Sequence, residues 1–170
     1  HEYFYNAKVI GIDINQDCKN HENTDENIFV EIGSQTDIDF LKSVHEKYGE
    51  FDLIIDDGSH MNYDELVSFE VLFPYVKQGG IYVVEDSVTS YWVGFGGGLY
   101  NKNSTVEYFK KLIDDVNFNG IINHDIDNYH SRREDLLIPY SLKKQPKCRV
   151  DIESIQFVNS LIFIEKKWHI

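Results

Sequence analysis

Short runs of β-branched and aromatic residues alternate along the chain with stretches of helical periodicity. The expected strands are 8–13, 27–31, 51–55 and 81–84. Apolar residues spaced three or four apart predict helices over 37–48, 63–73 and 105–116. The run 51–55 is apolar at four of its five positions, which is typical of a parallel strand buried on both faces.

The ends of these segments carry turn and cap residues. Asp37 and Ser104 stand where helix N-caps are expected, and Gly49 and Pro74 where helices end. The stretch 78–80 is expected to turn the chain before the fourth strand. Two further strands, 152–157 and 161–166, are predicted to form an antiparallel hairpin, whereas the polar segment 119–147 shows no clear pattern.

Alternating strands and helices predict an α/β fold with a mostly parallel, Rossmann-like sheet. Helices are expected on both faces of this sheet, and the final hairpin adds an antiparallel edge. The length of 170 residues favours a single domain over 1–170. No internal repeat interrupts this pattern.

Composition and charge limit the classes of partner and the cellular compartment that are expected. The net charge of −13 disfavours a phosphate backbone as partner, so we expect no nucleic acid. No apolar run approaches the ~20 residues of a membrane helix, so no membrane contact is expected. Cys18 and Cys148 lie far apart and lack partners at metal-binding spacing, which indicates reduced thiols in a cytoplasmic protein.

Acidic residues follow the predicted strands. Asp13 ends the first strand, Asp56 and Asp57 end the third, and Glu85 and Asp86 end the fourth. Ligands gather at the carboxyl ends of parallel strands. A single acid at a strand end can equally well be a helix N-cap. Two acidic pairs that face one crevice, however, repel each other unless a cation lies between them. Oxygen ligands favour Mg²⁺ or a similar divalent ion.

A histidine stands close to one of these acidic pairs. His60 comes three residues after Asp57, and Gly58 is expected to permit the tight turn between them. A lone histidine is more often structural or simply exposed. Beside a carboxylate and metal site, however, an imidazole is well placed to act as a general base.

Several of these residues fall in longer runs: VIGID at 9–13, IIDDGSHMN at 54–62, LFP at 72–74, GG at 79–80, YVVED at 82–86 and TSYW at 89–92. Together these runs resemble the class I S-adenosylmethionine-dependent methyltransferases. More narrowly, they resemble the metal-dependent sugar O-methyltransferases of the macrocin and mycinamicin type. The resemblance extends from about residue 3 to about 116 and resumes in the final hairpin.

The resemblance implies a cofactor site for S-adenosylmethionine. Asp13 matches the acid that binds the ribose hydroxyls, and Asp56 lies where a further cofactor contact is expected. Gly33, Ser34 and Gln35 match a Gly-Asp-Gln run near the adenine, from which Ser34 departs.

The resemblance also implies a metal and a base. Asp57 and Asp86 match ligands of Mg²⁺ or a similar ion, with Glu85 beside them as a further ligand. His60 matches the catalytic base, and Asp57 is expected to share in catalysis.

An acceptor site is implied next to the metal. Tyr91 and Trp92 lie where a sugar can stack, although core packing is the more common role of such aromatics. The stretch 94–98 resembles a mobile segment near the site. It is not a phosphate-binding loop, because no Gly-Lys-Ser/Thr follows it.

The family's glycine-rich turn, and the strand before it, are expected upstream of Tyr3 and do not occur in this sequence. We therefore expect the chain to be an N-terminally incomplete methyltransferase domain that binds the cofactor poorly in this form. Relatives form multimers, so a homo-oligomer is a further expectation.

The expected activity is metal-assisted methyl transfer to a sugar or related small polar acceptor, in polysaccharide or secondary-metabolite biosynthesis. Two alternatives stay open: a nucleotide-sugar glycosyltransferase, through acid-x-acid runs at 37–39 and 125–127, and a non-catalytic binding or scaffold domain. A NAD-dependent dehydrogenase is disfavoured, because no Gly-x-Gly-x-x-Gly occurs.

Overall fold

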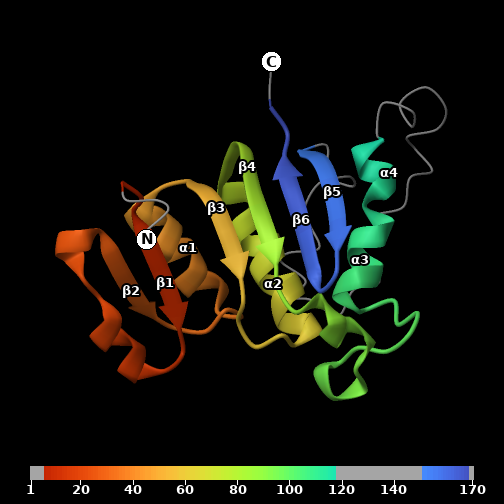
Figure 1. The fold of residues 1–170 in the computed structure, drawn as a ribbon, viewed down its shortest axis with the longest axis horizontal. Helices are drawn as coiled ribbons and strands as arrows, with labels where there is room; N and C mark the ends of the chain where they lie inside the picture. Colours follow the sequence, from red (N-terminus) through yellow and green to blue (C-terminus); the bar gives the residue numbers. More distant parts are fainter. Residues whose placement is uncertain (1–5, 118–150, 169–170) are drawn as a thin grey trace.

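The computed structural model describes residues 6–117 and 151–168. The strands are β1 (Val9–Asp13), β2 (Ile28–Ile32), β3 (Phe51–Asp56), β4 (Val76–Val84), β5 (Ile152–Val158) and β6 (Leu161–Lys166). The helices are α1 (Ile38–Tyr48), α2 (Asn62–Leu72), α3 (Thr105–Lys111) and α4 (Ile113–Val116). Their order along the chain confirms the predicted mixture of strands and helices (Figure 1).

The strands form two hydrogen-bonded sheets. β1 and β2 pair in parallel, and the second sheet has the order β3-β4-β6-β5, with β3 and β4 parallel and β6 antiparallel to both neighbours. The parallel strands with an antiparallel C-terminal hairpin confirm the predicted fold class. In Figure 1 the arrows of β1 to β4 all point toward the same edge, so their carboxyl ends lie along one side of the molecule.

The core lies between the second sheet and helices α2 and α3. Nine of the eleven residues of α2 are buried, which is why this helix shows no polar face. Phe69 stands at its centre, with its ring centroid 5.2 Å from that of Tyr82 on β4 and 4.7 Å from that of Phe109 on α3. This packing fixes the start of α2, and therefore the turn before it, against the end of β4.

The opposite face of the second sheet is less covered. Leu53, Ile55 and Ile81 are 45%, 54% and 37% exposed, although they stand on parallel strands. The expected helices on both faces are not found within 6–117 and 151–168, where the described helices pack into one core cluster. Among these residues, no helix is long and apolar enough to cross a membrane.

Two predicted boundaries are wrong. The stretch 78–80 does not precede the fourth strand but lies inside β4, where the pairing with β3 shifts register and Gly79 has a φ of 72°. A bulge therefore absorbs residues that the sequence assigned to a turn. The helix expected over 105–116 divides at Leu112, and Ile113, at the start of the second part, is 51% exposed. The caps at Asp37 and Ser104 are confirmed.

Buried polar groups join α2 to the start of α3. Asn62 accepts a hydrogen bond from the backbone N–H of Thr105 at 2.7 Å, and its amide nitrogen donates to the carbonyl oxygen of Phe95 at 2.9 Å. The hydroxyl of Thr105 donates to Glu65, which is 2% exposed. Burial, aided by nearby acids, raises the pKa of Glu65 to about 8, so this carboxyl is protonated at neutral pH.

We expect Glu65→Gln to remove a pH dependence of stability. The carboxyl has a pKa near 4.3 in the unfolded chain and about 8 in the folded chain. Between these values the unfolded chain releases the proton and the folded chain keeps it, so the free energy of unfolding falls as pH rises. Glutamine cannot ionise, and at pH 8 the variant should be more stable by on the order of 4 to 5 kcal/mol.

Urea unfolding of both proteins at pH 5 and pH 8 measures this difference. Glu46→Gln on the exposed face of α1 is the matched control and should not change the pH dependence. An equal fall in stability for wild type and Glu65→Gln would contradict the prediction.

Candidate metal and general-base site

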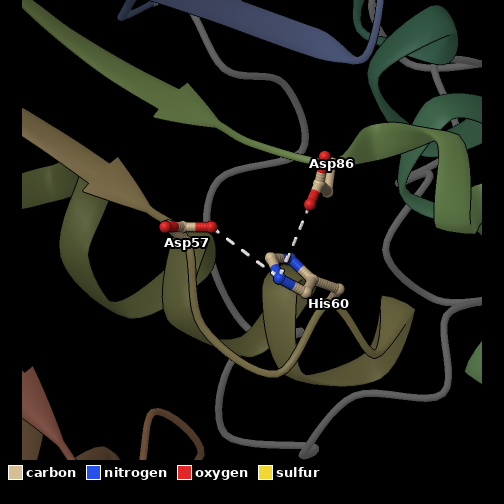
Figure 2. Close-up of side chains that lie close together, drawn as sticks. All are labelled: Asp57, His60 and Asp86. Atoms are coloured by element: carbon tan, nitrogen blue, oxygen red, sulfur yellow. Dashed lines mark ion pairs between the residues drawn. The ribbon is translucent and has the colours of Figure 1, made fainter.

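The structure brings three of the predicted residues together at the carboxyl ends of β3 and β4. Asp57 directly follows β3, Asp86 lies two residues beyond β4, and His60 comes from the turn before α2. His60 Nε2 is 3.7 Å from Asp57 Oδ1 and 3.8 Å from Asp86 Oδ2. Figure 2 shows both carboxylates directed toward the imidazole from neighbouring strand ends. The predicted convergence is confirmed for these three side chains.

The backbone of this cluster has an uncommon conformation. His60 and Asp86 have φ values of 57° and 50°, in the left-handed region that non-glycine residues seldom occupy. Gly58 is expected from the sequence to permit the tight turn, but it is not among the residues with positive φ. The left-handed residue of the turn is therefore the histidine itself. Such conformations cluster at functional sites, where the surrounding structure holds them.

The donor set suits a divalent cation. Asp57, His60 and Asp86 each offer one ligand atom, and these three atoms lie within 4.8 Å of one another. Among the described residues, this is the group of acidic and histidine side chains that could hold a metal ion. The two carboxylate oxygens match the ligands of Mg²⁺ or Mn²⁺, whereas an imidazole nitrogen is more typical of the later transition metals. The carboxylates are 60% and 61% exposed, and His60 Nδ1 is buried without a hydrogen-bond partner.

The second acid of each pair has a different environment. Asp56 is 8% exposed and accepts hydrogen bonds from the hydroxyls of Ser68 and Tyr82, the latter at 2.8 Å. Burial raises the pKa of Asp56, and these hydrogen bonds oppose the shift. Glu85 is half-buried and is not one of the three clustered groups. The structure thus directs Asp56 inward, and the roles predicted for Asp56 and Glu85 stay predictions.

The residues expected to contact the cofactor lie at the ends of β1 and β2. The carbonyl oxygen of Asp13 accepts the N–H of Gly33 at 2.9 Å, which joins the two strand ends. The Asp13 carboxylate is exposed and accepts the N–H of Asn15 at 2.7 Å. That bond, with one from Cys18, lowers the pKa of Asp13. An ionised, exposed carboxylate is suited to accept hydrogen bonds from ribose hydroxyls.

Ser34 and Gln35 are half-buried in the turn after β2. The Ser34 hydroxyl oxygen accepts the N–H of Thr36 at 3.2 Å and lies 2.9 Å from its hydroxyl. The Gln35 side chain reaches the turn of His60. This contact between Gln35 and the turn could not be predicted from local sequence patterns, because the two lie far apart in the chain.

The two aromatic residues expected to bind the acceptor are accessible. Tyr91 and Trp92 are 48% and 51% exposed, at the end of the 3₁₀ segment η4 (Ser87–Tyr91). Trp92 packs edge-on against Phe95, with 5.6 Å between ring centroids. The glycine loop that follows is closed by hydrogen bonds, among them Gly98 N–H to the carbonyl oxygen of Ser90 at 2.9 Å.

One site residue was missed. Ser160, in the turn between β5 and β6, donates its hydroxyl to Asp86 Oδ1 at 3.4 Å, and its carbonyl oxygen accepts the N–H of Ser87 at 3.1 Å. The sequence located this turn but gave no sign that it lies beside Asp86. Of the two acid-x-acid runs, Asp37 is a helix cap, as expected, and 125–127 lies outside the described residues.

Comparison with known proteins supports the resemblance. The L-olivosyl-oleandolide 3-O-methyltransferase of Streptomyces antibioticus is 48% identical over 88 residues, which are 49% of this chain and 23% of that protein. The 8-demethyl-8-alpha-L-rhamnosyl tetracenomycin-C 2'-O-methyltransferase of Streptomyces olivaceus is 32% identical over 97% of this chain and 39% of its own length. No protein-family model matches the chain.

The fold has a solved relative. The MycE methyltransferase of the mycinamycin biosynthetic pathway, in complex with Mg, SAH and mycinamycin VI, superposes with a TM-score of 0.70 and 29% identity, over 94% of this chain and 36% of that chain. These similarities confirm the resemblance to class I methyltransferases and to the sugar O-methyltransferases of macrolide pathways. The chain spans about a quarter to two fifths of the length of the curated relatives it matches.

We expect the chain to bind Mn²⁺, a spectroscopic substitute for Mg²⁺, through Asp57 and Asp86. Asp57→Asn and Asp86→Asn should each weaken Mn²⁺ binding by about tenfold or more, because each removes one of two anionic ligands. Electron paramagnetic resonance titration measures free Mn²⁺ directly. Asp52→Asn, an exposed acid at the opposite end of β3, is the matched control. Equal affinity in all four proteins would rule out this metal site.

Proposed function

We propose that the chain is the catalytic part of an S-adenosylmethionine-dependent, divalent-metal-assisted O-methyltransferase that acts on a sugar or a related small polar acceptor. The observation that carries the proposal is the convergence of Asp57, His60 and Asp86 at the carboxyl ends of parallel strands. The relationship to sugar O-methyltransferases supports the reaction class.

In this proposal His60 is the general base. A hydroxyl is a weak nucleophile until its proton is removed, and the imidazole can accept that proton as the oxygen attacks the methyl group of the sulfonium. His60 is 24% exposed, so its ring can be reached from solvent yet is held in place. Asp57 and Asp86 beside it stabilise the imidazolium that forms.

The same two carboxylates would hold the metal, together with Glu85. A divalent cation held there would lower the pKa of the acceptor hydroxyl. The chain's own contribution is positioning: the end of β3, the turn before α2 and the end of β4 present their side chains to one point. The solved relative contains Mg and SAH, which supports the proposal of a divalent metal and an S-adenosylmethionine site here.

We assign the cofactor to the neighbouring strand ends. Asp13 is proposed to bind the ribose, Gly33, Ser34 and Gln35 to line the adenine side, and Asp56 to lie beneath the cofactor. Their positions at the carboxyl ends of β1, β2 and β3 support this assignment.

The acceptor is proposed to lie over Tyr91 and Trp92, whose half-exposed rings can stack on a sugar. Acceptors of this class occur in polysaccharide and secondary-metabolite biosynthesis. A homo-oligomer and a cytoplasmic location stay predictions, the latter based on cysteine usage, with Cys18 a free thiol in the structure.

Calorimetric titration with S-adenosylhomocysteine in the presence of Mg²⁺ tests the proposal on the full-length gene product. A micromolar dissociation constant is expected, whereas UDP-sugars should produce no heat. No binding of S-adenosylhomocysteine by a folded protein would favour a scaffold role, and binding of a UDP-sugar would favour a glycosyltransferase.

His60→Ala should lower turnover by about a hundredfold or more, because the acceptor proton loses its base. The affinity for S-adenosylhomocysteine should stay within about twofold, since the imidazole is not part of the proposed cofactor site. Single-turnover methyl transfer from radiolabelled S-adenosylmethionine measures the first quantity, and calorimetry the second. His21→Ala, an exposed histidine near β2, is the matched control. Undiminished turnover in His60→Ala would exclude the role.

A further inference from the structure

Gln35 lies just beyond the end of β2, yet its side chain binds the turn that carries Asp57 and His60. Its amide oxygen accepts the backbone N–H of Ser59 at 2.7 Å, and its amide nitrogen donates to Asp56 Oδ1 at 3.2 Å. The two partners lie on either side of Asp57 in the sequence. A single side chain from the turn after β2 therefore spans the segment from which Asp57 projects.

The backbone of Gln35 is itself anchored. The N–H of Asp37 donates to the carbonyl oxygen of Ser34 at 3.1 Å, and the Ser34 hydroxyl accepts the N–H of Thr36 at 3.2 Å. Asp37 then caps α1 through the N–H groups of residues 39 and 40. The turn between β2 and α1 thus holds Gln35 from both sides, and its side chain leaves a fixed point.

Gly58 leaves room for this contact. A β-carbon built at position 58 meets the side-chain atoms of Gln35 first, and it overlaps the amide oxygen. Since Gly58 does not have a positive φ, an alanine would fit the backbone there. The glycine is therefore needed for space, and the amide of Gln35 occupies that space.

Ser59, the residue after Gly58, is held by hydrogen bonds at its backbone N–H and at its hydroxyl. While the N–H of Ser59 binds Gln35, its hydroxyl donates to Asp64 Oδ2 at 2.6 Å and accepts the N–H of Met61 at 3.2 Å. His60 stands between these contacts in the left-handed conformation. A backbone that L-residues seldom adopt needs such restraint to stay in place.

We propose that Gln35 is a positioning residue for the metal and general-base turn, fixing Asp57 and His60 through its hydrogen bonds to Ser59 and Asp56. This role is separate from the adenine contact assigned to Gln35 above, and it rests on the proposed metal site. It makes the end of β2 part of the machinery that presents the ligands at the end of β3.

The test combines Gln35→Ala and Gly58→Ala, singly and together. Gln35→Ala removes both hydrogen bonds, so Mn²⁺ affinity should fall by about tenfold or more, as for other groups that orient metal ligands. Gly58→Ala should produce a similar loss by displacing the Gln35 amide. In the double variant the added methyl group has free space, so its further effect should be within about twofold.

A second readout needs no metal. The Ser59 amide proton should shift upfield in nuclear magnetic resonance spectra of Gln35→Ala and Gly58→Ala, and should exchange faster with solvent. Gln156→Ala on the exposed part of β5 and Gly94→Ala, where a β-carbon meets nothing within 4 Å, are the matched controls. Thermal unfolding of each variant identifies any that has lost its fold.

The outcomes separate the two proposals. A folded Gln35→Ala with unchanged Ser59 resonance and unchanged Mn²⁺ affinity overturns the positioning role, as does an additive effect in the double variant. If wild-type protein binds no Mn²⁺, the metal site proposed above fails, and the Ser59 resonance alone decides whether Gln35 fixes the turn.

Discussion

The crowding of carboxylates at the carboxyl ends of β3 and β4 is the constraint from which the rest of the structure follows. Four acids lie at or next to the ends of these two strands, and like charges so close together repel. The fold separates them by direction. Asp56 faces inward onto Ser68 and Tyr82, while Asp57 and Asp86 face outward toward His60. Only the outward acids form a ligand set, so the local anionic charge is concentrated where a cation can offset it.

Helix α2 carries out this separation. It begins two residues after His60, its second turn presents Ser68 to Asp56, and Phe69 packs against Tyr82. The same apolar packing that stabilises the core thus sets the distance between the inward acid and the outward cluster. A helix with a polar face could not be buried so fully, which explains why nearly every residue of α2 is apolar or hydrogen-bonded.

The sequence was sufficient for the features that depend on local periodicity. Strand ends, the caps at Asp37 and Ser104, and the place of His60 beside Asp57 follow from patterns a few residues long. The bulge in β4 and the break at Leu112 did not follow, because tertiary packing decides them. Contacts such as Ser160 with Asp86 join residues 74 positions apart, and no local pattern encodes them.

The orientations of Asp56 and Asp57 show which features depend on the local sequence and which depend on the fold. Alternation along β3 places Asp56 on the same face as Ile54, so the burial of Asp56 is implied by the strand itself. The donors that make this burial tolerable come from α2, from β4 and from Gln35 after β2, and their convergence is a property of the fold. A buried carboxylate without donors would be costly. Asp56 and Asp57 therefore have different roles. The buried Asp56 accepts hydrogen bonds from three separate segments of the chain, whereas the exposed carboxylate of Asp57 is accessible to a ligand.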